Sequence, residues 1–186
     1  MKYFLVGYMA CGKTRRGKSM AEELGIRFID LDAYIVDREK RTIPEIFTAV
    51  GEAGFRKLET RYLKEVCELY KDFVLSTGGG TPCFNDNMES MNAQGHTVFI
   101  DTDVDTITER LIRGKHKRPM VSHLADDEIR DFVCKHREQR MPFYSLAKER
   151  MENRNNEPIK KYKDENDRFY SINTDDYGDF MQQREQ

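Results

Sequence analysis

The chain has 186 residues, with 31 Lys and Arg against 33 Asp and Glu and a formal net charge of −2. This length suits one α/β domain, so we expect residues 1–186 to form a single domain. The balanced charge indicates no nucleic-acid partner, and the sequence has no run of about 18 apolar residues that could span a membrane. The four cysteines are widely separated, without the spacing of a zinc site, and predict free thiols in a reducing cytoplasm. We further expect a monomer.

The most specific motif lies near the first residue. An apolar run at residues 3–6 predicts a buried strand, and Gly7 to Thr14 matches G-x-x-x-x-G-K-[ST] without a mismatch. Gly7 and Gly12 allow the loop to turn its backbone N–H groups toward one concavity, and a helix expected over residues 14–24 adds its positive N-terminal end. The motif therefore predicts a P-loop that cradles the phosphates of ATP.

The residues of this loop have separate expected roles. Lys13 would reach the β- and γ-phosphates, and the Thr14 hydroxyl would ligate Mg²⁺. Cys11 lies among the N–H donors of the loop and is therefore expected to be the most reactive of the four thiols. Arg15 and Arg16 follow directly, and we interpret them as solvent-facing charges on the first helical turn. The expected ATP contacts in the loop are Ala10, Cys11, Gly12, Lys13 and Thr14.

Two aspartates, Asp30 and Asp32, follow a second short strand expected at residues 26–29. Ligands of open α/β sheets bind outside the carboxyl ends of the strands, and alternate residues of a strand share a face. One carboxylate is therefore expected to hold Mg²⁺ through water, and the other to accept a proton from a substrate hydroxyl. The competing interpretation is that the pair only caps the following helix.

Helices are expected over residues 33–39 and from residue 43 onward, with Pro44 in the first turn and a break at Gly51. Apolar residues recur every three or four positions over residues 52–70, which predicts a long amphipathic helix.

Arg56 on this helix has two interpretations. It lies three residues before Glu59, so the two could form an ion pair on an exposed face. Alternatively, Arg56 could turn into a pocket and grip a planar anion with its forked guanidinium.

A third buried strand is expected at residues 73–76, followed closely by three glycines. Because glycine has no side chain, Gly78, Gly79 and Gly80 would let a ligand approach the backbone closely. A flexible surface loop is the alternative.

A basic cluster follows a strand expected at residues 97–100 and a helix expected at residues 104–112. The cluster consists of Arg110, Arg113, Lys115, His116, Lys117 and Arg118. Gly114 and Pro119 interrupt regular structure inside it, which suggests a lid at about 113–124 that closes over phosphates and expels water. A solvated basic loop is the alternative.

In the last third of the chain, Asp126 or Asp127 is expected to cap a helix that runs to Arg140. Residues 151–168 are nearly devoid of apolar side chains, which predicts a solvated helix end and loop, and residues 169–172 predict the last strand. Five strands that alternate with helices predict an α/β fold, a three-layer, doubly wound, mostly parallel five-stranded sheet of the P-loop nucleotide-kinase type.

Taken in order over roughly residues 3–147, these motifs resemble the shikimate kinase family. The resemblance rests on the P-loop and on segments 28–32, 41–47, 51–59, 76–80, 117–119 and 140–144. It implies phosphoryl transfer from ATP to the 3-hydroxyl of shikimate, in the route to chorismate and the aromatic amino acids. The substrate-binding segment would be about residues 32–60.

The resemblance also implies roles on the catalytic side of the site. Asp32 would contact substrate hydroxyls and accept the proton, whereas Asp30 would help to hold Mg²⁺ through water. Arg118 would be the lid arginine that contacts ATP and stabilises the transferring phosphoryl group. The implied catalytic set is Lys13, Asp32 and Arg118.

On the substrate side, the resemblance implies that Arg56 and Arg140 grip the carboxylate of shikimate, which favours the pocket for Arg56. The backbone of Gly78, Gly79 and Gly80 would form the third wall of that pocket.

Some positions depart from the family pattern. Arg15 stands where the family usually has a small Thr or Ser, and Arg16 stands where an apolar residue is usual, so both affect helix packing rather than the phosphate contacts. The hydrophilic stretch 151–168 is longer than expected, and either Arg110 or Arg113 is expected to stack on adenine.

Two other functions are considered. One is another small-molecule kinase of this fold, such as a gluconate-type kinase, and the other is a nucleotide-dependent switch. A switch needs neither a proton acceptor nor arginines on the substrate side, so the presence of Asp32, Arg56 and Arg140 counts against it.

Overall fold

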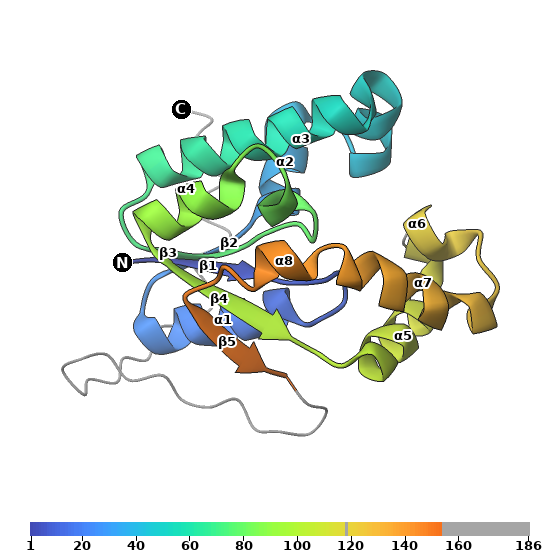
Figure 1. Ribbon diagram of the computed structural model, residues 1–186. Helices are drawn as coiled ribbons and strands as arrows, with labels where there is room; N and C mark the ends of the chain where they lie inside the picture. Colours follow the sequence, from blue (N-terminus) through green and yellow to red (C-terminus); the bar gives the residue numbers. More distant parts are fainter. Residues whose placement is uncertain (118, 154–186) are drawn as a thin grey trace.

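The apolar runs at residues 3–6, 73–76 and 97–100 form the three central strands of a five-stranded sheet (Figure 1). The computed structural model describes residues 1–117 and 119–153, without the side chains at 117 and 119. The strands lie in the order β2-β3-β1-β4-β5, and every neighbouring pair is parallel. Their bounds are Lys2–Val6 (β1), Arg27–Asp30 (β2), Phe73–Ser76 (β3), His96–Asp101 (β4) and Glu149–Glu152 (β5). The predicted doubly wound parallel fold is therefore confirmed.

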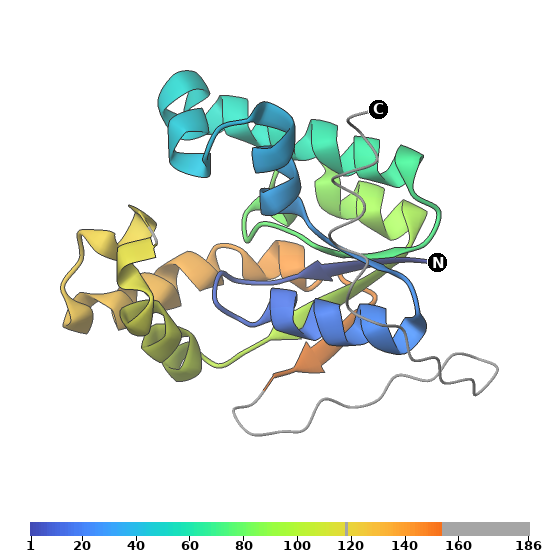
Figure 2. The same ribbon diagram turned by 180° about the vertical axis from the view of Figure 1, so that it is seen from behind.

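Helices cover both faces of this sheet, with α2, α3 and α4 on one side and α1 on the other (Figure 1, Figure 2). The helices are α1 (Lys13–Leu24), α2 (Leu31–Glu39), α3 (Ile43–Leu69), α4 (Asn87–Gln94), α5 (Val104–Arg113), α6 (Pro119–Ser122), α7 (Asp126–Glu138) and α8 (Met141–Tyr144). Two short 3₁₀ helices, η1 (Thr81–Cys83) and η2 (Lys115–Lys117), complete the regular structure of the described residues. None of the described helices is long and apolar enough to cross a lipid bilayer.

The two faces of the sheet carry separate hydrophobic clusters. Phe4 of β1 packs in the cluster that includes Leu63 of α3, whereas the next residue, Leu5, packs in the cluster that includes Met20 of α1. Successive strand residues point to opposite faces, so a strand with helices on both sides needs apolar residues at every position. This requirement explains why the central strands are continuous apolar runs.

Local signals set several helix ends where the sequence predicts them. Gly25 ends α1 in a left-handed conformation with φ 63°, and its N–H donates to Ala21 O and Glu22 O. Thr42 and Glu45 form a capping box at the start of α3. The helix α2 begins at Leu31, two residues earlier than expected, because the Asp30 carboxylate accepts the Ala33 N–H at 3.3 Å and caps it.

The cap expected for α7 is wrong. Its N-cap is Ala125, whose N–H donates to the Glu128 carboxylate at 2.7 Å. Asp126 and Asp127 instead lie in the first turn, where their charge favourably faces the positive end of the helix dipole. The helix also ends at Glu138, and Arg140 becomes the N-cap of α8.

The prediction for residues 151–168 is wrong where the structure describes them. Residues 149–152 form β5, the last strand of the sheet within the described residues, which pairs in parallel with β4, and Asn153 is buried beyond it. The strand is hard to recognise because its inward residues are only partly buried and its polar side chains have partners, such as His96 for Glu149 and Asp101 for Arg150. The strand expected at 169–172, like residues 154–168, lies outside the described residues.

The segment expected to form a lid contains two short helices, η2 and α6, rather than an irregular loop. With α5 and α7 they form a group beyond the carboxyl ends of the strands (Figure 1). Val121 of α6 is fully buried in the core cluster, so this segment is anchored at its middle.

The helix α3 is broken at Gly51, as predicted. Gly51 has φ 67° and ψ −177°, a backbone region that is essentially restricted to glycine. A Cβ at this position would meet no atom within 4 Å, so the constraint comes from the backbone alone.

We predict that Gly51→Ala lowers the free energy of unfolding by about 1–3 kcal/mol, because alanine is strained in this conformation. In an ordinary helical position the same change would stabilise the protein by about 1 kcal/mol. Urea unfolding followed by circular dichroism measures the difference. The control is Ala49→Gly on the exposed face nearby, which should cost about 0.5–1 kcal/mol. A stabilised Gly51→Ala protein would show that the break is not held by this residue.

Candidate functional site

The P-loop connects β1 to α1 at the carboxyl edge of the sheet. Gly7 has φ 141° and Gly12 has φ 101°, conformations that side chains rarely allow. A Cβ on Gly7 would lie 2.7 Å from Ile100 O, so the loop also sits too close to β4 for a side chain there. Lys13 is buried, and its Nζ donates to Gly7 O at 2.8 Å and to Tyr8 O at 2.9 Å. The ammonium group therefore lies within the curve of the loop.

Thr14 and Asp30 lie side by side next to this loop. The Thr14 hydroxyl donates to Asp30 Oδ2 at 3.0 Å, while Asp30 Oδ1 caps α2. Asp30 therefore caps α2, as the competing interpretation expects, and it also faces the first residue after Lys13. The described residues contain no group of three His, Cys, Asp or Glu side chains that could hold a metal. Two oxygen ligands nevertheless fit Mg²⁺, which usually keeps several waters and takes further oxygens from phosphates.

Asp32 begins the substrate side of the site. Solvent reaches its side chain, but partial loss of hydration, followed by repulsion from Asp30 and Glu59, raises the pKa of Asp32 to about 6. Lys13 and Arg56 oppose this rise. A carboxylate with a pKa just below neutrality is ionised at pH 7 and is still basic enough to accept a proton.

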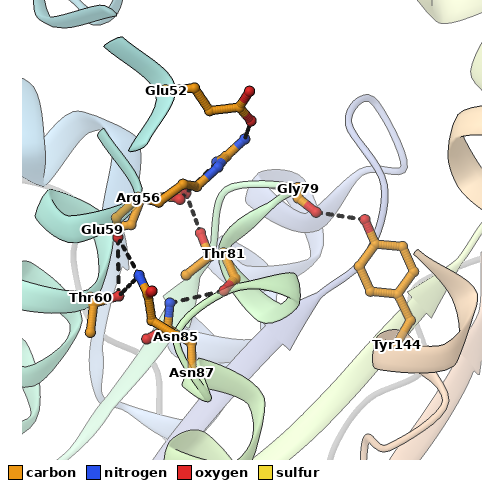
Figure 3. A network of polar contacts seen from close by, with 9 residues as sticks. All are labelled: Glu52, Arg56, Glu59, Thr60, Gly79, Thr81, Asn85, Asn87 and Tyr144. Carbon is orange, nitrogen blue, oxygen red and sulfur yellow. Dashed lines mark hydrogen bonds and ion pairs between the residues drawn. The ribbon is translucent and has the colours of Figure 1, made fainter. Parts of the chain in front are cut away.

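Arg56 forms the ion pair expected from its spacing and also reaches the site. Its Nη1 donates to the buried Glu59 at 2.7 Å, and its Nη2 donates to the exposed Glu52 at 3.0 Å (Figure 3). The Arg56 Nε is buried, and among the described residues it has no hydrogen-bond partner. The guanidinium also lies 4.5 Å from the ring centroid of Phe84. The two interpretations are therefore compatible.

The three consecutive glycines each face a different predicted substrate residue. A Cβ on Gly78 would lie 2.6 Å from Glu59 Oε1 and 3.1 Å from Asp32 Oδ1, and one on Gly79 would lie 3.2 Å from Arg140 Nη1. A Cβ on Gly80 would lie 2.6 Å from Arg56 Nη1. The loop after β3 therefore brings the expected carboxylate and both expected arginines around one stretch of bare backbone.

Several side chains that the sequence did not assign hold this glycine loop (Figure 3). Thr81 donates to Glu59 Oε1 at 2.5 Å, and Asn87 Nδ2 donates to Thr81 O at 2.9 Å. From the opposite side, the Tyr144 hydroxyl donates to Gly79 O at 2.6 Å. Glu59 is 1% exposed, so its ion pair with Arg56 and its bond to Thr81 are made inside the protein. A buried glutamate three residues after an arginine gives no distinct sequence signal, whereas Tyr144 does lie in the segment 140–144 singled out above.

Arg140 is buried and packs over a residue of the P-loop. Its guanidinium lies 5.8 Å from the ring centroid of Tyr8, and the Tyr8 hydroxyl lies 2.9 Å from His136 Nδ1 on α7. Burial, with the nearby Arg140, lowers the pKa of His136 to about 4, so its imidazole is neutral at pH 7 and can accept a hydrogen bond from the tyrosine hydroxyl. Burial also raises the pKa of Tyr8 to about 12.

Three expectations for the basic residues have different outcomes. Arg15 is exposed, as predicted, but Arg16 is 6% exposed and the prediction that it faces solvent is wrong. Of the two candidates for adenine, Arg110 donates to Ala10 O of the P-loop at 3.1 Å, whereas Arg113 is exposed and pairs with Glu109. Arg118 lies outside the described residues.

These features together define the fold of a P-loop kinase, in which a carboxylate and two arginines lie around the glycine loop beside the P-loop. The profile of a family described as shikimate kinase matches residues 9–167. A shikimate kinase from Phocaeicola vulgatus is 48% identical over 147 residues, which cover 79% of this chain and 83% of that protein.

Solved structures agree with this result. The shikimate kinase from Bacteroides thetaiotaomicron has a TM-score of 0.78 and 47% identity, covering 82% of this chain and 86% of that one. The shikimate kinase from Acinetobacter baumannii in complex with shikimate has a TM-score of 0.73 and 34% identity, covering 85% of each chain. This chain belongs to the shikimate kinase family, and the family uses ATP as a substrate.

The expectation that Cys11 is the most reactive thiol does not fit its burial. Cys11 is 1% exposed and packs in the cluster between the sheet and α1. Its position inside the loop places the sulfur against the core, away from solvent.

We predict that an alkylating reagent modifies Cys134 first, because Cys134 is partly exposed. Cys83 should follow, since burial raises the pKa of its thiol, and the buried Cys11 and Cys67 should react last. Mass spectrometry of digested protein after short labelling times measures the order. The same labelling in denaturant should remove the differences. Early modification of Cys11 in the folded protein would contradict the prediction.

Proposed function

We propose that this protein transfers the γ-phosphoryl group of ATP to the 3-hydroxyl of shikimate and releases shikimate 3-phosphate and ADP. The observation that carries the proposal is the glycine loop, whose three backbone positions face Asp32, Arg140 and Arg56 in turn. A small hydroxy acid presents a carboxylate and hydroxyls, and this arrangement offers arginines for the former and an acceptor for the latter. Membership of the shikimate kinase family, and the shikimate complex of the Acinetobacter baumannii protein, support this choice of acid.

The carboxylate would be held by Arg56 and Arg140. On Arg56, Nη1 is engaged by the buried Glu59, whereas Nη2 faces the exposed Glu52 and Nε has no partner among the described residues. Exposed ion pairs contribute little, so Glu52 is readily displaced. The Nε and Nη2 edge is therefore the edge that would donate two parallel bonds to a substrate carboxylate.

Asp32 would act as the general base. As the 3-hydroxyl oxygen forms its bond to the γ-phosphorus, the bond from that phosphorus to the bridging oxygen of ADP breaks, and the hydroxyl proton moves to Asp32. Lys13 would exchange its bonds to Gly7 O and Tyr8 O for bonds to the phosphate oxygens of ATP.

Thr14 and Asp30 would hold Mg²⁺, the latter through water, and the ion when bound would neutralise negative charge on the phosphates. Arg110 would lie on the adenine side, because its guanidinium contacts the P-loop. The lid at about 113–124 would bring Arg118 to the transferring group. We also propose a cytoplasmic monomer without a nucleic-acid partner, consistent with the four free thiols.

The experiment that tests the proposal is a coupled assay of ADP release with shikimate, with gluconate and without an acid. Turnover with shikimate alone supports it. Turnover with gluconate alone would show that gluconate, and not shikimate, is the substrate. Nucleotide binding with no turnover on either acid would favour a nucleotide-dependent switch.

We predict that log kcat/KM for shikimate rises with unit slope up to pH about 6 and is then level, because Asp32 must lose its proton to act as a base. Asp32→Asn should lower kcat far more than it lowers ATP affinity. Initial rates at saturating ATP over pH 4.5–8.5 measure the profile. A level profile down to pH 4.5 would show that Asp32 is not the general base.

The raised pKa of Asp32 also makes the stability of the folded protein depend on pH. Asp32 binds its proton more tightly in the folded protein than in the unfolded chain, where its pKa is 3.8, so its ionisation destabilises the fold above pH about 6 and has no effect below pH about 4. We predict that Asp32→Asn raises the Tm of the ligand-free protein at pH 8 and leaves it unchanged at pH 4. Asp37→Asn on the same helix is the control; it removes only an exposed pair with Lys40 and should give no gain. A gain at pH 4 as large as that at pH 8 would contradict the assignment.

We predict that Arg140→Lys weakens shikimate binding about tenfold to a hundredfold, since a charge-assisted contact contributes about 1.5–3 kcal/mol and lysine lacks the fork. ADP affinity should stay at the wild-type value. Calorimetry with each ligand measures both. The control is Arg130→Lys on the exposed face of α7, which should change neither affinity. Normal shikimate binding by Arg140→Lys would exclude this arginine from the carboxylate site.

A further inference from the structure

Arg16 lies on the side of α1 that faces the core. Its contacts differ from those of an arginine that faces solvent. Its Nε and Nη2 donate to Asn153 Oδ1 at 3.1 and 3.0 Å, and the two residues are only 6% and 2% exposed. They are 137 positions apart in the chain. Burying a guanidinium is costly unless its donors are satisfied, so this contact is a specific feature of the folded protein.

The other end of the Asn153 amide contacts the P-loop. Asn153 Nδ2 donates to Cys11 O at 2.6 Å and to Thr102 Oγ1 at 3.2 Å. The Thr102 hydroxyl in turn donates to Cys11 O at 2.8 Å. The Asn153 backbone N–H donates to Asp101 O at 2.7 Å, which fixes the residue at the carboxyl end of β4. Two donors anchored on the sheet thus hold one carbonyl of the loop.

The orientation of that carbonyl determines where the next N–H points. In a planar trans peptide the C=O and the N–H point in opposite directions. With Cys11 O held toward Asn153 and Thr102, the Gly12 N–H is directed away from them. Gly12 is the N-cap of α1 and has φ 101°, and a Cβ there would lie 2.8 Å from Asn153 Nδ2. The loop therefore rests directly on the Asn153 amide.

We propose that Arg16 and Asn153 are positioning residues that hold the Cys11–Gly12 peptide with its N–H toward the bound phosphates. Arg16 fixes the amide by its oxygen, and the amide fixes the loop by its nitrogen. The inference rests on the proposed function only in taking the P-loop to bind a nucleotide, and it is independent of which acid is phosphorylated.

The test uses Asn153→Asp in the full chain. The carboxylate keeps the size of the side chain and its contact with Arg16, but it has no N–H for Cys11 O. It also attracts the Thr102 hydroxyl, so the carbonyl loses its second donor as well. We expect ADP affinity to fall about three- to tenfold, as for the loss of one or two neutral hydrogen bonds. Shikimate affinity should stay close to the wild-type value.

The matched control is Asn92→Asp. Asn92 Nδ2 also donates to a backbone carbonyl, Leu146 O, at 2.8 Å, and its oxygen accepts from Thr97 near the start of β4, at the opposite edge of the sheet. The same atoms are changed in both variants, although Asn92 is only partly buried and its oxygen faces a hydroxyl instead of a guanidinium. Asn92→Asp should bind ADP normally.

The new negative charge is tested separately by repeating the calorimetry at low and high salt. Screening weakens a direct repulsion between the phosphates and the carboxylate that Asn153→Asp introduces, but it does not restore a hydrogen bond. The ratio of wild-type to variant affinity should therefore persist at high salt.

Arg16→Met, which releases the amide without touching it, should lower ADP affinity in the same direction. Lys18→Met on the exposed face of α1 is its control for the lost charge and should have little effect. If Asn153→Asp does not fold, the comparison of Arg16→Met with Lys18→Met still tests the inference.

The outcomes separate clearly. Loss of ADP affinity in Asn153→Asp and Arg16→Met, at normal shikimate affinity and independent of salt, supports the inference. Normal ADP affinity in the folded variants, an effect that disappears at high salt, or an equal effect in the two control variants would overturn it. A wild-type protein that binds no ADP would overturn the proposed function together with this inference.

Discussion

The site depends on how closely the backbone at residues 78–80 approaches several charged side chains. A side chain at Gly80 would displace Arg56, and one at Gly78 or Gly79 would crowd Glu59 and Asp32 or Arg140. The loop keeps this position because Thr81 binds Glu59 on one side and Tyr144 binds Gly79 O on the other. The parallel sheet places the end of β3 beside the P-loop, since β3 and β1 are neighbours.

The three carboxylates near this loop, Asp30, Asp32 and Glu59, have different surroundings. Glu59 is buried against Arg56 and Thr81 and serves as an anchor. Loss of hydration, followed by repulsion from Asp30 and Glu59, raises the pKa of Asp32. Asp30 is used twice, as a helix cap and as a neighbour of Thr14. The position of each acid relative to the arginines and the sheet edge thus decides its role.

The sequence predicts this fold well where the backbone or the core permits few alternatives. Residues 3–6, 73–75 and 98–100 are apolar because both faces of the sheet are covered, and Gly7, Gly12 and Gly51 adopt conformations that favour glycine. The expected site residues that are described also gather at one edge, because parallel strands end there. Prediction from the sequence fails where the position of a side chain is set by a residue far away in the chain. Arg16 is buried because of Asn153, and the sulfur of Cys11 is turned into the core by the fold of the loop.

The charged side chains of β5 also have a structural consequence. Its residues Glu-Arg-Met-Glu pair with β4, and in the described part of the chain β5 is an outer strand of the sheet. Charged side chains on a strand can pair with side chains of the neighbouring strand and so add to the main-chain hydrogen bonds. The charges that hide β5 from hydrophobic patterning therefore also tie it to β4, since Glu149 pairs with His96 and Arg150 with Asp101.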